Sequence, residues 1–153
     1  MGATMPNTTV TTPGFWDDAE VIHAYTAADA VADGDLVALD DKLVKSHRIL
    51  VPVLMTRAAY ADAVDWTRGD DEGQSITGRA HDVLSIITFM GIAKRAADTN
   101  EKVPFELHRI PDKTPSGQPS RSTTALRTRL QINIEGYDMT GMPCFIISMP
   151  GED

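Results

Sequence analysis

The sequence has a single cysteine, Cys144, so the chain cannot form an internal disulfide. Such sparse cysteine usage is typical of proteins from a reducing compartment. The sequence also lacks any apolar run as long as a membrane span or the hydrophobic part of a secretory signal. We therefore expect a cytoplasmic protein that has no membrane partner.

Motifs that indicate a particular chemistry are also absent from the sequence. The chain has no P-loop, no dinucleotide-binding fingerprint and no nucleophile-elbow motif. No two histidines are four residues apart, and Cys144 has no partner in a CxxC motif. Metal-ligand spacing is therefore absent, and we expect neither a metal ion nor another cofactor. The sequence alone does not assign a function.

Positive charge is scarce in the first half of the chain. The net charge is −8, and residues 1–75 hold thirteen carboxylates against five lysines or arginines. Residues 76–153 hold nine of each, so the whole excess lies in the first half. An acidic surface repels the phosphates of nucleic acids and suits a soluble protein, a basic partner or mimicry of a polyanion.

The length of 153 residues suits one domain with a substantial core. Residues 1–14 are polar and interrupted by two prolines, which predicts a flexible lead before a single domain over residues 15–153. Apolar residues recur at helical spacing from Val83 to Ala97, which predicts a central helix over about 79–98. A second helix is predicted over about 57–67, with Thr56 as its N-cap.

The last third of the chain has the alternation of strands. Leu126, Leu130, Ile132 and Ile134 alternate with polar residues, which predicts a strand with one buried face. Further strands are predicted over 51–55, 103–110 and 144–149, and the last one pairs with its predecessor as a hairpin. The order of these elements predicts an α+β fold, with an antiparallel sheet of three to five strands and both main helices on one face.

One polar line crosses the predicted central helix. His81, Ser85 and Thr88 lie at positions i, i+4 and i+7, and Asp82 is adjacent. If this line faces a cleft, His81 is a candidate acid or base, with Asp82 to orient it and Ser85 within reach. The alternative is a solvent-facing stripe whose hydroxyls bond back to helix carbonyls.

A second candidate is the polar face of the strand over 125–135. Arg127 and Arg129 share that face with Gln131, and we expect Arg109 of the neighbouring strand to join them. Such a row suits an anion, a nucleic-acid strand or the carboxylates of a partner. The alternative is an ordinary solvent face with cross-strand ion pairs to Glu106, and no aromatic residue interleaves with the arginines.

The C-terminal residues PGED are a third candidate. Glu152, Asp153 and the terminal carboxylate come together there, which suits either a basic partner or a free tail. PGED also belongs to one of three segments of the chain that together form a larger pattern. They are FWDDAEVIHAYTAADAVADGDLVAL, VPVLMTRAAYADAVDW, and VPFELHRIP with the terminal strand and PGED.

Together these segments resemble a family of unknown function, whose small proteins are encoded by bacterial plasmids and phages and end in PGED. The resemblance covers most of residues 15–153 and implies an accessory protein of a mobile element in a bacterial cytoplasm. It implies no activity. This chain departs from the family pattern at Tyr60 and His81, where the family has tryptophan.

Three functional hypotheses follow from these observations. The first is a phage- or plasmid-encoded accessory protein that binds a host protein in a regulatory or anti-defence role. The second is a nucleic-acid-associated protein that uses the Arg127 and Arg129 face. The third is a small enzyme with His81, Asp82 and Ser85 at the start of the central helix. Self-association into a homo-oligomer is left open.

Overall fold

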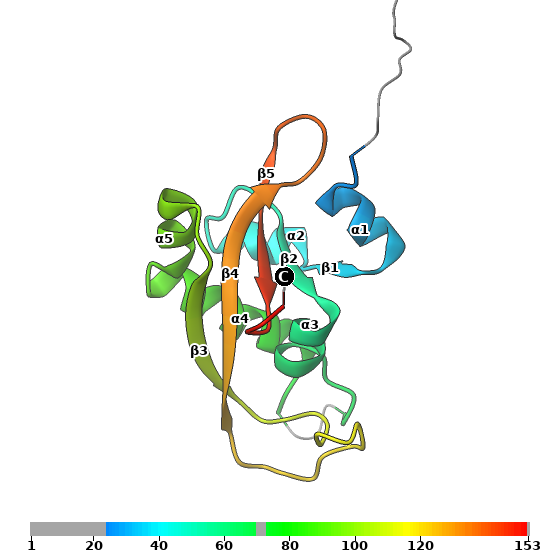
Figure 1. Ribbon diagram of the computed structural model, residues 1–153. Helices are drawn as coiled ribbons and strands as arrows, with labels where there is room; N and C mark the ends of the chain where they lie inside the picture. Colours follow the sequence, from blue (N-terminus) through cyan, green and yellow to red (C-terminus); the bar gives the residue numbers. More distant parts are fainter. Residues whose placement is uncertain (1–23, 70–72, 153) are drawn as a thin grey trace, which may run out of the picture.

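The computed structural model describes residues 24–69 and 73–152. Within these residues, five strands form one sheet in the order β1-β2-β5-β4-β3 (Figure 1). The strands are β1 (Leu36–Ala38), β2 (Val53–Thr56), β3 (Val103–Arg109), β4 (Leu126–Gly136) and β5 (Pro143–Ser148). Neighbouring strands are antiparallel except β2 and β5, which are parallel. The predicted α+β class is confirmed, and the sheet is mixed but mostly antiparallel.

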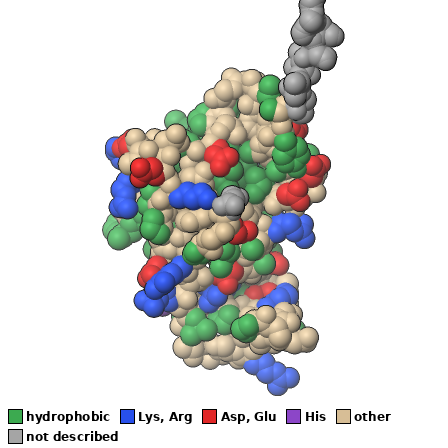
Figure 2. All heavy atoms as spheres, viewed as in Figure 1, with side chains coloured by type: hydrophobic (Ala, Val, Ile, Leu, Met, Phe, Trp, Pro, Cys, Tyr) green, Lys and Arg blue, Asp and Glu red, His purple; other side chains and the backbone are tan. Residues whose placement is uncertain are grey.

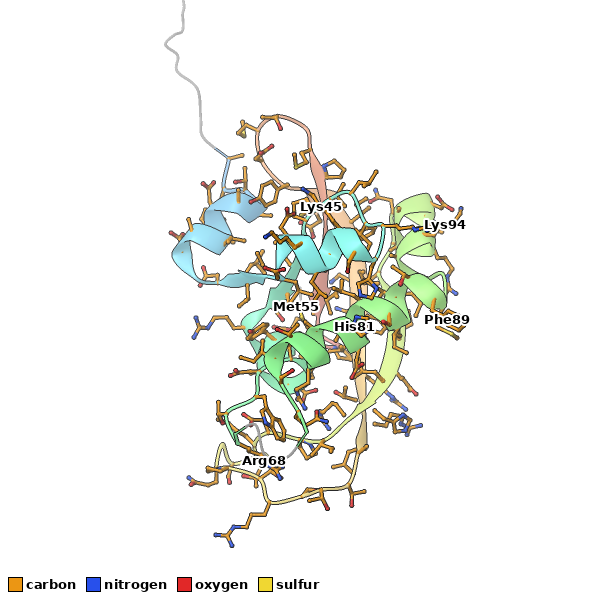
Figure 3. All side chains as sticks on the ribbon, turned by 180° about the vertical axis from the view of Figure 1, so that it is seen from behind. Lys45, Met55, Arg68, His81, Phe89 and Lys94 are labelled. Atoms are coloured by element: carbon orange, nitrogen blue, oxygen red, sulfur yellow. The ribbon has the colours of Figure 1, made fainter. Side chains whose placement is uncertain are left out.

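The helices are α1 (Ala27–Asp33), α2 (Asp41–Ser46), α3 (Arg57–Ala63), α4 (Ile76–Phe89) and α5 (Ile92–Thr99). A short polar residue caps the start of α1, α2, α3 and α4. The side chains of Thr26, Asp40, Thr56 and Ser75 each accept a hydrogen bond from the backbone N–H three residues later. α3, α4 and α5 cover one face of the sheet (Figure 1). In the reverse view, α2 lies beside α4 on that side (Figure 3). No helix of the described residues is long and apolar enough to cross a membrane.

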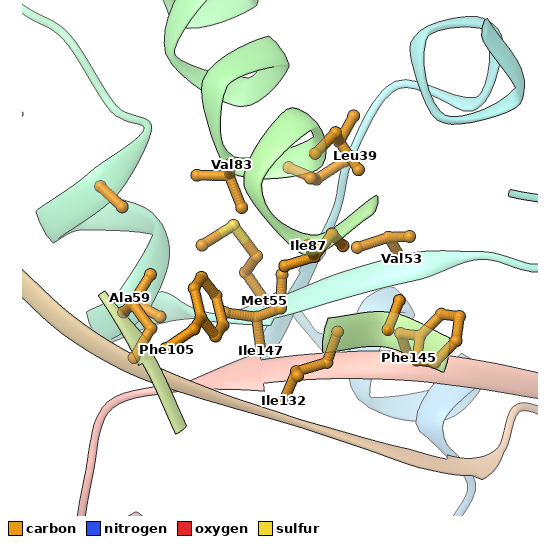
Figure 4. Packing of buried hydrophobic residues seen from close by; sticks show 14 of the residues in the cluster. Leu39, Val53, Met55, Ala59, Val83, Ile87, Phe105, Ile132, Phe145 and Ile147 are labelled. Carbon is orange, nitrogen blue, oxygen red and sulfur yellow. The ribbon is translucent and has the colours of Figure 1, made fainter. Parts of the chain in front are cut away.

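The core lies between the sheet and these helices. Met55, Phe105, Ile132 and Ile147 come from four different strands and meet Ile87 of α4 (Figure 4). Each of these side chains is at least nine-tenths buried, and most are completely buried. Because alternate residues of a strand face the same side, this burial confirms the predicted alternation of β4.

The opposite face of the sheet is partly covered by the C-terminal residues. Glu152 accepts hydrogen bonds from the Thr56 hydroxyl at 2.8 Å and from the Met149 backbone N–H at 2.7 Å. The Glu152 carbonyl accepts from Lys102 and from Gln131. Glu152 therefore anchors the end of the chain and does not hang free.

The predicted central helix over 79–98 is wrong in its continuity. α4 begins earlier, at Ile76 after the Ser75 cap, and α5 begins only after Gly91. Gly91 has a φ of 70°, in the left-handed region that a glycine adopts easily and that a helix cannot contain. Met90, predicted to face the core, is consequently exposed.

The predicted helix over 57–67 also ends early, at Ala63. Val64 and Trp66 are both buried, and the backbone carbonyls of Asp62 and Val64 accept hydrogen bonds from the guanidinium of Arg79. The guanidinium of Arg79 therefore supplies these carbonyls with the donors that the backbone N–H groups of a longer helix would have supplied. The predicted lead over residues 1–14 and residues 15–23 of the predicted domain lie outside the described residues.

Replacement of Gly91 by alanine tests the helix break, because a break and a continuous helix predict opposite changes in the free energy of unfolding. A Cβ at Gly91 meets nothing within 4 Å, so the cost comes only from the left-handed backbone. We expect Gly91→Ala to lower the free energy of unfolding by about 1 kcal/mol. A continuous helix would instead be stabilised by about 1 kcal/mol. Urea denaturation, with Gly136→Ala as the control in open space without a positive φ, distinguishes the two.

Candidate functional site

A groove opens on the helical side, between the segment after α2 and the junction of α4 and α5. Its volume is about 280 Å³. Its lining consists of His47, Arg48, Ile49, Leu50, Val51, Ile87, Thr88, Ala93, Lys94 and Phe145. Ile49, Ile87, Ala93 and Phe145 are buried residues of the core, so the floor of the groove is apolar.

Large apolar side chains of the groove wall and of the chain that follows it are exposed to solvent. Leu50, in its wall, is 87% exposed, and Phe89, which directly follows the wall residue Thr88, is 89% exposed. Met90 is 64% exposed beside it. Phe89 projects outward from the α4–α5 junction (Figure 3). Exposed apolar side chains beside a concave apolar surface are typical of a protein-interaction site.

The charged residues that line the groove are both cations, Arg48 and Lys94. Lys94 is exposed and pairs with Asp98 at 2.6 Å on the same helix, and this hydrogen bond raises the pKa of the ammonium. Arg48 has a φ of 64°, which lets its backbone N–H bond back to the Lys45 carbonyl as α2 ends. The groove is therefore locally basic in a chain that is acidic overall.

The structure brings together two of the three predicted catalytic candidates and adds a third residue. The Ser85 hydroxyl lies 3.4 Å from Nε2 of His81. Nδ1 of His81 lies 3.0 Å from Nε2 of His47, which also lines the groove. The two imidazole rings are 4.7 Å apart between centroids. Sequence reasoning missed His47, because the pair is 34 residues apart in the chain.

Asp82 does not join this group. It lines a different, small cavity with Arg79 and His108, on another side of α4. The hydroxyl of Thr88 donates to the Leu84 carbonyl, as the alternative interpretation of the polar line expects. The predicted arrangement, in which Asp82 orients His81, is therefore not what the structure has.

The His47–His81 contact predicts a dependence of stability on pH. Burial, and then the neighbouring His81, lower the pKa of His47 below 6.5 in the folded chain. The unfolded chain therefore binds more protons between the two pKa values, and stability falls as pH decreases through this window from about 6.5. Between pH 8 and pH 5, the free energy of unfolding should decrease less for His47→Gln than for the native chain. Identical slopes would contradict the contact.

The predicted arginine row is only partly formed. Arg129 and Arg127 both lie near the carboxylate of Glu106, at 3.1 and 3.8 Å, and all three side chains are exposed. Gln131 donates to the Ser148 hydroxyl. On the sheet face seen in Figure 2, Lys and Arg side chains are interspersed with Asp and Glu. The cross-strand pairing therefore neutralises part of the positive charge that a nucleic acid would use.

Arg109 lies on the other face of the sheet, which corrects its predicted place in this row. Arg109 is separated by an even number of residues from the buried Val103, Phe105 and Leu107, so its side chain lies on their face of β3. Its guanidinium pairs with Asp62 of α3 at 2.7 Å. The prediction failed because it relied on strand adjacency and ignored the alternation of β3.

A larger cavity, of about 640 Å³, lies between α3 and the segment that follows β3. Its charged groups are already paired within the chain: Asp62 with Arg109, and Asp112 with Lys113 and Thr67. Although burial favours the protonated acid, the backbone N–H of Thr67 and the Lys113 ammonium hold the pKa of Asp112 below its usual range. The Asp112–Thr67 hydrogen bonds therefore anchor the segment after β3 on the residues that follow α3.

Other candidate chemistry is limited. Burial raises the pKa of the Cys144 thiol to about 11, so it stays protonated and unreactive at neutral pH. Within residues 24–69 and 73–152, no group of three or more His, Cys, Asp or Glu gathers to hold a metal ion. Asp153, a predicted binding residue, lies outside the described residues.

Comparisons with protein-family models, with curated proteins and with solved structures find no match to this chain. The resemblance to the PGED-ending family therefore stays a prediction from the sequence. The function has to be argued from the site itself.

Proposed function

We propose that the chain is an accessory protein of a bacterial phage or plasmid that binds a host protein in the cytoplasm, in a regulatory or anti-defence role. The observation that carries this proposal is the near-complete exposure of Leu50, in the wall of an apolar groove, and of Phe89, which follows the wall residue Thr88 in the chain. Full burial of each side chain in an interface is worth about 1.5–3 kcal/mol. Two such anchors supply a binding hot spot of ordinary size.

The groove also indicates the chemistry of the partner. Its apolar floor suits an apolar side chain of the partner, and Arg48 and Lys94 at its wall suit carboxylates. The partner is therefore a host protein segment that presents apolar anchors next to acidic residues.

Replacement of the aromatic anchor tests this proposal. We expect Phe89→Ser to weaken capture of the host protein at least tenfold, because an interface loses about 1.5–3 kcal/mol of apolar burial. The control is Met139→Ser, which changes another large exposed apolar side chain, 61% exposed, in the loop between β4 and β5. The measurement is affinity purification from nuclease-treated host lysate, followed by titration of the purified partner against the native chain and both variants.

The other outcomes contradict the proposal in distinguishable ways. Equal affinity of the native chain and Phe89→Ser for the host protein would show that the groove is not part of the interface. Recovery that nuclease abolishes would point instead to nucleic acid at Arg127 and Arg129. Concentration-dependent dimerisation that Phe89→Ser abolishes, measured by light scattering, would assign the groove to a second copy of the chain.

The two alternative hypotheses have less support. Arg127 and Arg129 share the carboxylate of Glu106, which reduces the positive charge that they present to the phosphates of a nucleic acid. Ser85 and His81 meet at 3.4 Å, which is longer than an activated nucleophile–base pair of about 2.6–3.2 Å. We therefore advance neither as the function.

A further inference from the structure

The contact between His47 and His81 has the geometry of two ligands of one metal ion. Nε2 of His47, at the C-terminal end of α2, faces Nδ1 of His81 on α4 at 3.0 Å. For metal–nitrogen bonds of about 2.0–2.1 Å and bond angles of about 90–110°, two imidazole nitrogens are roughly 2.9–3.4 Å apart. The two ligand atoms are therefore already close to the separation that a shared ion requires.

One tautomer of His81 leaves its ligand atom free for a metal ion. When the Ser85 hydroxyl accepts the Nε2–H proton across their 3.4 Å contact, Nδ1 keeps its lone pair. A metal-bound histidine usually donates its other ring N–H to such an acceptor, which fixes the ring. Ser85 is therefore a positioning residue for His81.

In the free protein one proton satisfies the pair, shared between Nε2 of His47 and Nδ1 of His81. A divalent ion takes the place of that proton, and His47 then carries its proton on Nδ1. The exposed position of the pair gives an ion direct access.

We propose that His47 and His81 together bind a divalent transition-metal ion that prefers imidazole ligands, with water in the remaining coordination positions. Zn²⁺, Cu²⁺ and Ni²⁺ have this preference, and among them Cu²⁺ forms the most stable complexes with nitrogen ligands. Mg²⁺ and Ca²⁺ prefer oxygen ligands and should not bind. The site goes beyond the proposed protein interaction, since neither Phe89 nor Leu50 supplies a ligand.

The test is titration of the full, untagged chain with Zn²⁺ by calorimetry, and with Cu²⁺ by electron paramagnetic resonance. We expect one equivalent bound, with nitrogen hyperfine splitting from two imidazoles. His47→Gln and His81→Gln should each weaken binding at least tenfold, and Ser85→Ala should weaken it by about tenfold through loss of the hydrogen bond that holds His81. His108→Gln, on the opposite face of the sheet, is the matched control and should bind like the native chain.

Thermal unfolding without metal checks that each variant folds, and Zn²⁺ should raise the melting temperature of the native chain and of His108→Gln only. Two independent ligand variants keep the test decisive if one of them is unstable. Affinity that is unchanged in both ligand variants would overturn the proposal. So would equal loss in His108→Gln, because the metal would then bind histidines without regard to the pair.

Discussion

Arg79→Met should lower the free energy of unfolding by about 3–5 kcal/mol, which is a large part of the total stability of a domain of this size. Arg79 is only 3% exposed and donates hydrogen bonds to three backbone carbonyls. These carbonyls belong to Asp62, Val64 and Ile110. The guanidinium also stacks over Trp66, 5.1 Å from the ring centroid.

The size of this effect follows from what the substitution leaves behind. Methionine fills a similar volume but donates nothing, so the Val64 and Ile110 carbonyls, in two separate segments, lose this donor, whereas the Asp62 carbonyl keeps Arg109. Each unsatisfied buried group costs about 1–3 kcal/mol. The measurement is urea denaturation at pH 7, with Arg95→Met on the exposed side of α5 as the control, expected within about 0.5 kcal/mol of the native chain. A loss below about 1 kcal/mol for Arg79→Met would show that Arg79 does not hold these segments together.

Leu84→Ala is the second substitution with a large expected effect. Leu84 of α4 is completely buried against the core, and truncation removes its packing and leaves a cavity. The expected loss is about 2–5 kcal/mol in the free energy of unfolding. The adjacent Ser85→Ala changes a half-buried side chain on the same helix, outside the core cluster, and is expected within about 0.5 kcal/mol.

This pair of substitutions tests which face of α4 packs on the sheet. Both place alanine at neighbouring positions of one helix, so helix propensity contributes little to the difference. Chemical denaturation of both variants under identical conditions is the measurement. Equal destabilisation by the two would contradict the burial of one face only.

Local sequence patterns were sufficient to predict most strands and the helix caps. The alternation of Leu130 and Ile132 with polar neighbours directly reflects one buried face of β4. The apolar run over 144–149 was predicted as a strand, and β5 is the middle strand of the sheet. Thr56 caps its helix as expected. Each of these features is decided by residues close together in the chain.

The features that were missed depend on contacts between distant residues. The early end of α3 depends on Arg79, and the parallel pairing of β2 with β5 joins segments about ninety residues apart. The break at Gly91 had a local cause, a glycine near the end of an apolar stripe, but the stripe outweighed it in the prediction. Periodicity alone does not reveal where a helix turns away from the sheet.

The candidate site was predicted only in fragments for the same reason. His81 and Ser85 were paired correctly because they are four residues apart on one helix. His47 lies in a segment whose structure was ambiguous from the sequence, and it reaches His81 only through the packing of α2 beside α4. The groove itself combines residues 47–51 with α5, and no short motif encodes such a surface.

The central claim is that Phe89 enters the interface with a host protein, and site-specific photo-crosslinking tests it most directly. A photoreactive phenylalanine analogue replaces either Phe89 or, as the control, Met139, and the chain is irradiated in host cells. The account predicts one discrete crosslinked host protein from position 89, joined at a segment with apolar and acidic residues, and none from position 139. The same crosslinked protein from both positions, or none from position 89, would contradict it.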